Sequence, residues 1–482
     1  MNFENIKEFI PKSTDFLSVL PELSLLCFAM LVLLLAVVFE KHHFKKIGAI
    51  SIIFTAISLS FPIIAMRYCP HQASGSYFAG TLGAFGFFTI FVFICAILTQ
   101  IMAFRYLSKK PTEHKSEFFA VIMLSALSAS ILARAENFVL LFVALECFVM
   151  SLYAMVAWSR KSVFCLDGAM KYIIISGVSS AILLMGIALL YVVVPQDLSF
   201  ASVLSAKAGE STLGAVALVM IFSGLLFKLG AFPFQFWVSD VYQSAPTPAS
   251  AYLAVVSKGV GIFLILKLLI ALGLNYANVV NVFAVIACLT ILAGNMAGLL
   301  QRNVKRLLAL SGVSNAGYLL LLICVALKSS ELSPIVGVVL FFYLMTYAFS
   351  TYTLFGIINT YKKADDETLS FDDFRGMFKK DRITSGALVI ALSSLAGIPP
   401  TAGFFAKLLI IILAFAVGLY IPLAIMLIGS AMSIYYYFAW IRAVFVDNEE
   451  PYQFLRSRYS AICFIFLSLA TLLFGAVALL LV

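Results

Sequence analysis

Long apolar segments follow one another along the whole chain, and they constrain the fold more than any other feature. Of the 482 residues, 63% are hydrophobic and 11% are charged, whereas about 25% of the residues in a soluble domain are charged. About 20 apolar residues in a helix cross a bilayer core about 30 Å thick, and the helix satisfies its own backbone groups where lipid offers no partner. The chain is therefore predicted to be an all-α, polytopic membrane protein.

Hydropathy predicts about fourteen transmembrane spans joined by short polar loops. The twelfth is interrupted and is counted as one broken span. The polar start of the chain lacks the basic-then-apolar order of a cleaved signal peptide, so the first span is expected to remain in the protein. The predicted spans are 15–39, 47–66, 78–104, 116–133, 135–157, 169–194, 211–231, 251–272, 277–299, 304–327, 333–360, 384–420, 422–446 and 459–481.

Basic residues are distributed unevenly between two sets of alternate loops. The loops after odd-numbered spans hold most of the 32 Lys and Arg residues, among them Lys45, Arg105 and Arg306. Cytoplasmic loops carry an excess of Lys and Arg, so both termini are predicted to face the periplasm of a bacterial inner membrane. The net charge of +9 then reflects membrane topology and requires no nucleic-acid partner.

Few charged residues remain inside the predicted spans once the loops are set aside. A charge at the bilayer centre costs about 2.5–3.5 kcal/mol on insertion scales, although lysines near a span end can extend to the interface. Lys171 and Lys267 lie near span ends and have this simpler explanation. Four other charged residues lie deeper in a span or beside an interruption of one. They are Glu146, Lys228, Lys258 and Lys407, and Glu146 is the one acid deep in a span.

The deep residues suit the transfer of protons or cations. Burial disfavours the ammonium form of a lysine, and a nearby carboxylate favours it, so a change of partner makes the lysine release or take up a proton. Glu146 and Lys228 are predicted to form such a switch, from which Lys258 and Lys407 pass the proton on through water. The sequence alone does not show that these residues meet.

Two helix breaks accompany the buried lysines. Span seven is interrupted at Gly230 to Pro233, and span twelve at Pro399, Pro400 and Gly403. Paired interruptions at corresponding places are typical of inverted-repeat transporters, although two unrelated proline kinks remain an alternative. Spans 4–8 and 9–13 are predicted to form two inverted five-helix repeats, with the divisions 1–115, 116–272, 277–446 and 447–482.

Other kinds of site find little support. The eight cysteines are far apart and the histidines lie in predicted loops, so neither an iron–sulfur cluster nor a haem is expected in this chain.

The segment 233–248 is predicted to be a short interfacial helix and turn, because it is aromatic and lacks Lys and Arg. The loop from Lys362 to Arg382 is a docking surface or a solvated loop.

Several motifs resemble the antiporter-like subunits of respiratory complex I. They are Phe227-Lys228-Leu229-Gly230, Pro233 to Trp237, Asp240 to Pro248, Ser257-Lys258-Gly259, Gly294-Asn295 with Lys305 and Arg306, and Ser394 to Lys407. Together they extend over most of the chain from about residue 115 to 445. The Asp240-Val241-Tyr242-Gln243 version and a lysine at position 407 are similar to the N-subunit branch of this family.

The resemblance implies a proton-translocating membrane subunit of an NADH–quinone oxidoreductase. It implies that Glu146 is the acid of helix five, Lys228 its partner on broken helix seven, Lys258 the central relay and Lys407 the outlet-side lysine. Lys171 stands where the family often has a sixth-helix lysine. NADH, FMN, iron–sulfur clusters and quinone are expected on other subunits, and the expected partners are the antiporter-like subunit M, small subunits of the J/K type and lipid.

The chain departs from the family pattern at three positions. Gln235 and Asn315 stand where histidine is common, and Ser239 where proline is common. Water or residues such as Ser257 and Tyr318 are expected to connect the lysines instead. Two alternatives stay open, a subunit of a Mrp-type cation/proton antiporter and a purely structural membrane subunit.

Overall fold

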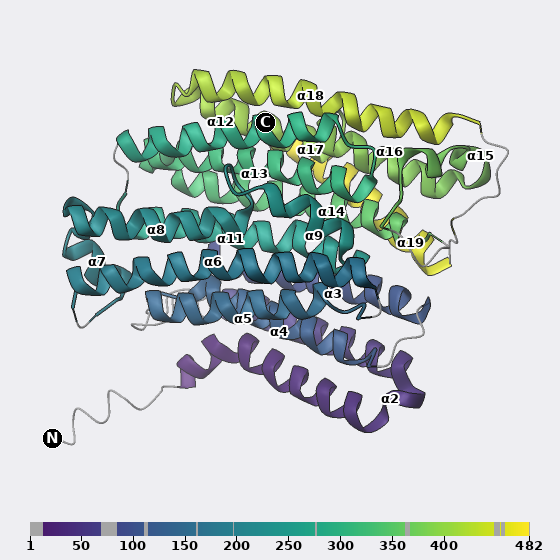
Figure 1. Cartoon of the computed structure of the whole chain (residues 1–482), viewed down its shortest axis with the longest axis horizontal. Coiled ribbons are helices and arrows are strands. Elements are labelled where there is room, and N and C mark those ends of the chain that lie inside the picture. Colours follow the sequence, from purple (N-terminus) through teal and green to yellow (C-terminus); the bar gives the residue numbers. More distant parts are fainter. Residues whose placement is uncertain are drawn as a thin grey trace.

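Helices account for nearly all of the described chain. The computed structural model describes residues 13–68, 84–109, 114–160, 162–195, 197–274, 277–361, 367–447, 454 and 458–481. The long helices run roughly parallel to one another, with α2 at one side of the bundle and α18 at the other (Figure 1). The prediction of an all-α protein is therefore confirmed for the described residues.

The helices fall where hydropathy places the spans. The first, α2, holds two spans that meet at a kink at His43. The longer helices are α2 (Ser13–Tyr68), α3 (Ala84–Lys109), α4 (Glu117–Arg134), α5 (Phe138–Val156), α6 (Val163–Val193), α8 (Thr212–Leu229), α11 (Lys258–Ala271), α12 (Ala277–Leu299), α13 (Val304–Lys328), α14 (Ser333–Ile358), α16 (Arg382–Ala396), α17 (Ala402–Ala416), α18 (Tyr420–Phe445) and α19 (Arg458–Leu481). The shorter ones are α7 (Phe200–Ser205), α9 (Phe236–Ser244), α10 (Thr247–Tyr252) and α15 (Met377–Lys380).

Twelve helical segments of the described residues are long and apolar enough to cross a membrane. Three further apolar helices are shorter: Arg382–Ala396, Ala402–Ala416 and Ser460–Ala476. The first two are the halves of the broken segment. When these halves count as one segment, the described residues have an apolar helical segment at each of the fourteen places where hydropathy predicts a span.

The sixth span begins earlier than predicted. The helix α6 starts at Val163 rather than at residue 169, because the Ser162 hydroxyl accepts a hydrogen bond from Cys165 N and caps the first turn. Lys171 therefore lies about two turns inside α6, instead of next to its end.

Each break has the same local structure. Gly230 (φ 72°) caps the end of α8 and Gly397 (φ 84°) caps the end of α16, and glycine adopts this left-handed conformation without a steric cost. In both breaks the following amide reaches back to the last turn, Ala231 N to Leu226 O and Ile398 N to Ser393 O, each 3.0 Å. The chain thus stops one helix with a Schellman-type cap before the prolines redirect it.

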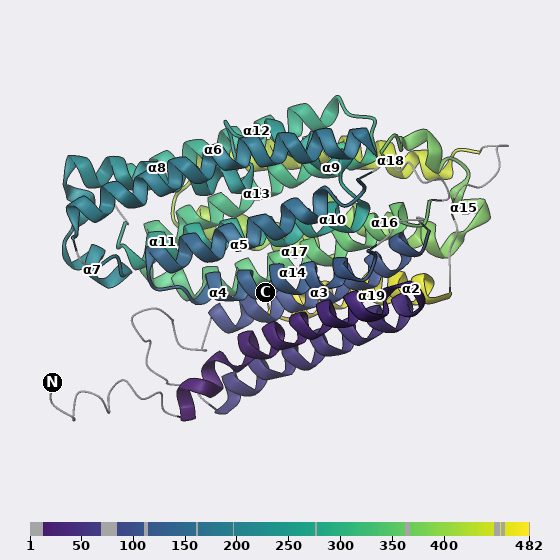
Figure 2. The same ribbon diagram turned by 60° about the horizontal axis from the view of Figure 1, so that its bottom comes forward.

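The segment predicted to be interfacial contains the expected short helix, α9, which packs one face against neighbouring helices and leaves Phe236 exposed and Asp240 partly exposed on the other. α9 continues α8 end to end in both ribbon views (Figures 1 and 2). Trp237, Val238, Val241 and Tyr242 are all buried. Its surroundings are therefore protein on several sides, which explains why a polar, broken stretch is tolerated at this place.

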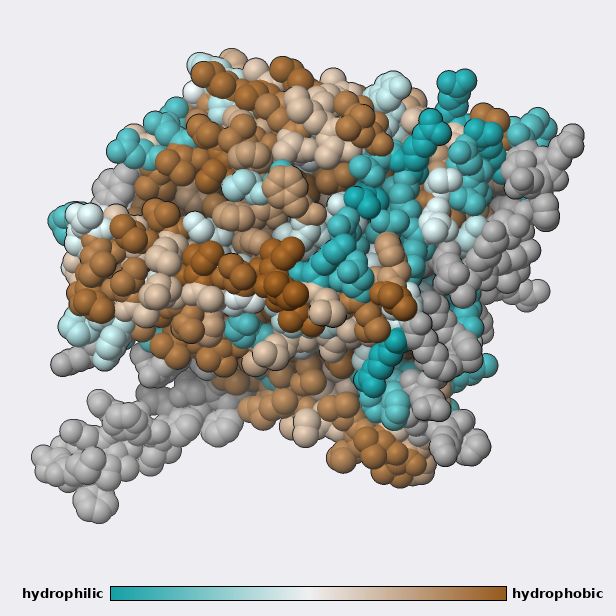
Figure 3. Space-filling model, in the orientation of Figure 1, coloured by the Kyte–Doolittle hydropathy of each residue, from teal (hydrophilic) through white to brown (hydrophobic). Residues whose placement is uncertain are grey.

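The surface is apolar where the helices face outward. In Figure 3 brown residues cover most of the left and middle of the molecule, and hydrophilic residues gather towards the right, where α15 lies. Large side chains such as Leu300 and Val163 are more than four-fifths exposed, which suits contact with lipid.

The division of the chain at 116–272 and 277–446 into two inverted repeats stays a prediction.

Candidate functional site

Three helices bring Glu146 and Lys228 together. Lys228 lies in the last turn of α8, where the carbonyl end of the helix favours a cation, and its Nζ is 3.9 Å from Glu146 Oε1 on α5. Ser180 of α6 lies between them: its Oγ donates to Glu146 Oε1 (2.6 Å) and accepts from Lys228 Nζ (2.8 Å). Ser176 Oγ accepts a further hydrogen bond from Lys228 Nζ, at 2.7 Å.

This unit is unevenly buried. The side chain of Lys228 is 6% exposed and that of Glu146 is 24% exposed. The acid therefore reaches towards the outside of the chain, while the lysine is enclosed by it. The predicted pair is close together in the structure. The sequence did not indicate Ser180, which bridges the pair, or Ser176, which contacts only Lys228 of the two.

Lys258 begins α11 directly after a π-helical turn, Leu253–Ser257. Such turns often occur at functional positions. Lys258 is buried, its Nζ donates a long hydrogen bond of 3.5 Å to Ala309 O, and it lies 5.8 Å from the centre of the Tyr242 ring. These contacts hold an ammonium group weakly, which suits a group that exchanges protons.

Gly312 of α13 makes the room for this ammonium group. A methyl group added at Gly312 would collide with Lys258 Nζ and would lie 2.8 Å from the Tyr347 hydroxyl. Lys258 and Tyr347 thus converge over the same face of one glycine.

Lys407 lies beside the second break and is buried as well. Its Nζ donates to Leu395 O (2.9 Å) and Ala396 O (3.1 Å), which are carbonyls at the end of α16 that lack helical partners. It also lies 5.3 Å from the centre of the Tyr318 ring. The helix end and the aromatic face both favour a positive charge here.

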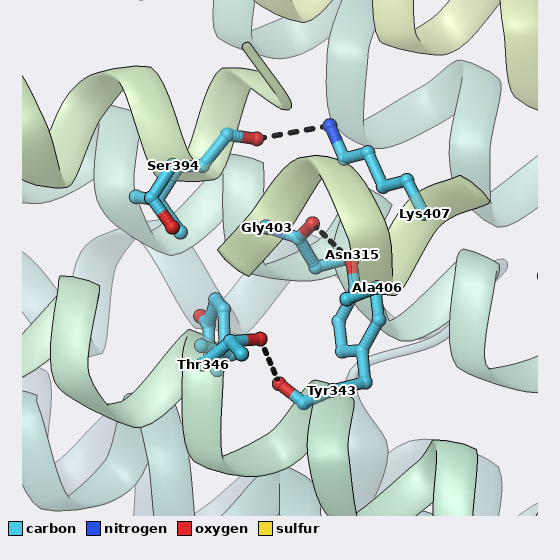
Figure 4. A pocket seen from close by; sticks show the side chains of 9 residues that line it. Asn315, Tyr343, Thr346, Ser394, Gly403, Ala406 and Lys407 are labelled. Atoms are coloured by element: carbon cyan, nitrogen blue, oxygen red, sulfur yellow. Dashed lines mark hydrogen bonds between the residues drawn. The ribbon is translucent and has the colours of Figure 1, made fainter. Parts of the chain in front are cut away.

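A small cavity adjoins Lys407 (Figure 4). Its volume is about 10 Å³, close to the lower limit for one water molecule. Tyr343 donates to Asn315 Oδ1 (2.8 Å) at its edge. The lining residues are Asn315, Tyr343, Thr346, Tyr347, Ser394, Leu395, Gly403, Ala406 and Lys407.

The glycine of the second break has a steric role. A side chain at Gly403 would collide with the carbonyl oxygen of Ser394, so the start of α17 approaches the end of α16 more closely than any other residue type allows. In the first break, Gln235 is buried and its Oε1 accepts no hydrogen bond from the described residues.

Lys171 lies apart from the buried lysines. Its side chain is 49% exposed and pairs with Asp167 (2.8 Å) and Asp240 (3.7 Å). Arg306 also reaches Asp240, at 3.0 Å, and these side chains line an outer hollow of about 110 Å³. The structure thus groups Lys171 with surface charges and not with the Glu146–Lys228 unit.

A second acid, besides Glu146, is enclosed by the protein. Glu22 of α2 is buried, and its carboxylate accepts hydrogen bonds from Arg134 (3.0 Å) and Ser130 (2.7 Å). Residues 22 and 134 lie towards the ends of predicted spans, where charges usually reach water, so the sequence did not indicate this pair. The structure buries them against each other instead.

Lys267 has the structural role that its position near a span end favoured. Its Nζ pairs with Glu136 at 3.2 Å and donates to the carbonyls of Ala133 and Ala135. It therefore ties α11 to the turn that joins α4 to α5.

Among the residues that the structure describes, no group of three or more His, Cys, Asp or Glu side chains is placed to hold a metal ion.

Comparisons with known proteins agree on one group of relatives. Residues 135–433 match the family described as NADH:quinone oxidoreductase/Mrp antiporter, transmembrane. The chain is 37% identical to NADH-quinone oxidoreductase subunit N 1 of Opitutus terrae, over 94% of this chain and 91% of that protein.

Solved structures show the same fold. A chain of respiratory complex I from Thermus thermophilus superposes with a TM-score of 0.80 at 27% identity, covering 94% of this chain and 96% of that one. A chain of the Mrp complex from a Dietzia species has a TM-score of 0.81 at 18% identity, covering 97% and 95%, a level of identity at which only the fold is shared.

Proposed function

Because the chain belongs to the NADH:quinone oxidoreductase/Mrp antiporter family of transmembrane proteins, we propose that it is the N-type subunit of a proton-pumping NADH–quinone oxidoreductase. The relative in Opitutus terrae that carries the subunit N name covers nearly the whole chain. The single structural observation that carries the proposal is the buried unit of Glu146, Ser180 and Lys228 beside a helix break.

The chain's own residues then supply a proton path. With Glu146 close, Lys228 holds its proton; when the carboxylate moves away, burial disfavours the ammonium form and the proton leaves. Lys258 receives it in a weakly bonded pocket, and Lys407 passes it on towards the outlet side. The energy for moving Glu146 comes from quinone reduction elsewhere in the complex.

The location of the cofactors follows from this assignment. NADH, FMN, the iron–sulfur clusters and quinone bind other subunits, and this chain contacts the antiporter-like subunit M and small J/K-type subunits. We place the protein in a bacterial inner membrane with both termini on the periplasmic side, because most Lys and Arg residues lie in the opposite set of loops.

Purification of the complex through an affinity tag on this chain tests the assignment. In mild detergent, NADH oxidation with quinone as acceptor should co-purify with the tag, and vesicles containing the complex should acidify when NADH is added. Vesicles that instead exchange Na⁺ for protons without any NADH oxidation would support the alternative, a Mrp-type antiporter subunit.

A further inference from the structure

Two packed helices place polar groups in layers between Lys258 and Lys407. A short turn after Lys328 joins α13 to α14, so the two helices run in opposite directions. Gly312 of α13 faces Tyr347 of α14, and one turn further Asn315 of α13 contacts Tyr343 of α14 at 2.8 Å. Residues three or four apart share a helix face, so both layers border the same side.

Lys258 lies next to the first pair, Gly312 and Tyr347. Lys407 lines a cavity with the second pair, Asn315 and Tyr343. Lys258 Nζ lies over Gly312, beside the Tyr347 hydroxyl. Tyr347 also lines the cavity of about 10 Å³ that Lys407 lines. Tyr347 thus lies both next to the space that the Lys258 ammonium group occupies over Gly312 and in the wall of the cavity that Lys407 lines.

The geometry points to a specific connection: Tyr347 and one water molecule in this cavity carry protons from Lys258 to Lys407, and Tyr343 with Asn315 orients that water. The inference rests on the proposed function. It names groups that would do the work of the histidines that are common in the family at positions 235 and 315. A cavity needs about 10–15 Å³ and two to four polar partners to hold a water molecule. Asn315, Tyr343 and Ser394 line this one together with Tyr347 and Lys407.

The scheme consists of three proton transfers between four groups, and it balances. An N–H bond of the Lys258 ammonium breaks as an O–H bond forms on Tyr347, whose own hydroxyl proton passes to the water. The water gives one of its protons to the neutral amine of Lys407. Each oxygen gains and loses one proton, so the net change is the loss of a proton by Lys258 and its gain by Lys407.

Tyr343 is a positioning residue in this scheme. Its hydroxyl proton is committed to Asn315 Oδ1, and Asn315 Nδ2 is fixed by Ser311 O at 2.9 Å. The lone pairs of the Tyr343 hydroxyl are therefore left to accept a hydrogen bond from the cavity water. When the water donates one hydrogen to the Tyr343 hydroxyl, its other hydrogen points to Lys407. A lone pair of the water then faces the Tyr347 hydroxyl.

The test uses the whole complex in vesicles, with NADH-driven proton uptake as the readout. Tyr347→Phe removes the relaying hydroxyl, and Tyr343→Phe removes the orienting one. Tyr352→Phe is the matched control, because Tyr352 is equally buried in α14 but bonds to Thr99 (2.8 Å) instead of the cavity. Lys258→Ala is included to test the proposed function itself, and a native gel reports the amount of intact complex.

We expect Tyr347→Phe to lower the rate of uptake at least about tenfold, since a positioned acid–base group typically contributes 10²–10⁴-fold. Tyr343→Phe should lower it less, and both variants should show a larger difference between H₂O and D₂O than the wild type and Tyr352→Phe. If Tyr347→Phe pumps like the control while Lys258→Ala does not pump, the connection is wrong and the function stands. If Lys258→Ala pumps normally, the proposed function itself is wrong.

Discussion

The hydroxyl of Ser180 offers a fine test of the Glu146–Lys228 unit, because it contacts both charged groups and carries no charge. It donates to Glu146 Oε1 at 2.6 Å and accepts from Lys228 Nζ at 2.8 Å. Replacement by alanine removes both hydrogen bonds and leaves the lysine and the carboxylate in place, 3.9 Å apart.

The size of the effect follows from these contacts. A hydrogen bond to a charged group contributes about 1.5–3 kcal/mol. Two bonds are lost, but Lys228 keeps Ser176 Oγ and Glu146 is partly exposed, so water replaces some of the loss. We therefore expect the paired state to become less stable by about 1.5–3 kcal/mol in total, a factor of about 10 to 150 in its equilibrium constant.

The assay is the initial rate of NADH-driven proton uptake into vesicles that hold the complete complex. Ser180→Ala should lower this rate substantially at an unchanged amount of complex. Ser223→Ala is the matched control, because Ser223 is a partly exposed serine of α8 whose hydroxyl donates to the Val219 carbonyl (2.7 Å). Uptake by Ser180→Ala at the rate of Ser223→Ala would refute the view that the pair depends on this bridge.

Three further variants separate stability from proton transfer. Glu22→Ala leaves the buried Arg134 without its carboxylate, so the complex should lose about 3–5 kcal/mol of stability and fall apart at a lower temperature, while intact complex should still pump; an unchanged melting temperature would contradict this. Gly403→Ala would force the new side chain onto the Ser394 carbonyl, so we expect the helix break to be distorted and proton uptake to be lost. Normal uptake would show that the break accommodates a methyl group at position 403. Gln235→Leu removes a buried amide oxygen that the described residues leave unsatisfied; proton uptake should fall with the complex intact, and unimpaired uptake would exclude Gln235 from the path.

Much of the fold could be predicted from the sequence because lipid imposes a simple rule. Every long apolar segment must be a helix that satisfies its own backbone groups, so hydropathy alone places the spans. Glycine and proline likewise predict where helices stop, as at Gly230 and Gly397. The burial of one face of α9 was not predictable in this way, because its polar composition resembles that of a surface helix and its burial depends on neighbours distant in the sequence.

The candidate site was predictable residue by residue but not as an arrangement. Lys228, Lys258 and Lys407 stand out because each is a charge within an apolar segment. Ser180 does not, since a serine in a membrane helix usually bonds its own backbone. Glu22 and Arg134 each resemble a charge near a span end, and only the packing of α2 against α4 shows that they are buried together.

The most direct test of the central claim replaces Lys228 with alanine and, separately, with arginine in the intact complex, and measures NADH oxidation and proton uptake in the same vesicles. Arginine keeps a positive charge next to Glu146 but does not give up its proton. Because Lys228 is proposed to release a proton, both variants should lose proton uptake. Normal pumping by the Lys228→Arg complex would contradict this account, since a fixed charge at position 228 would then be sufficient.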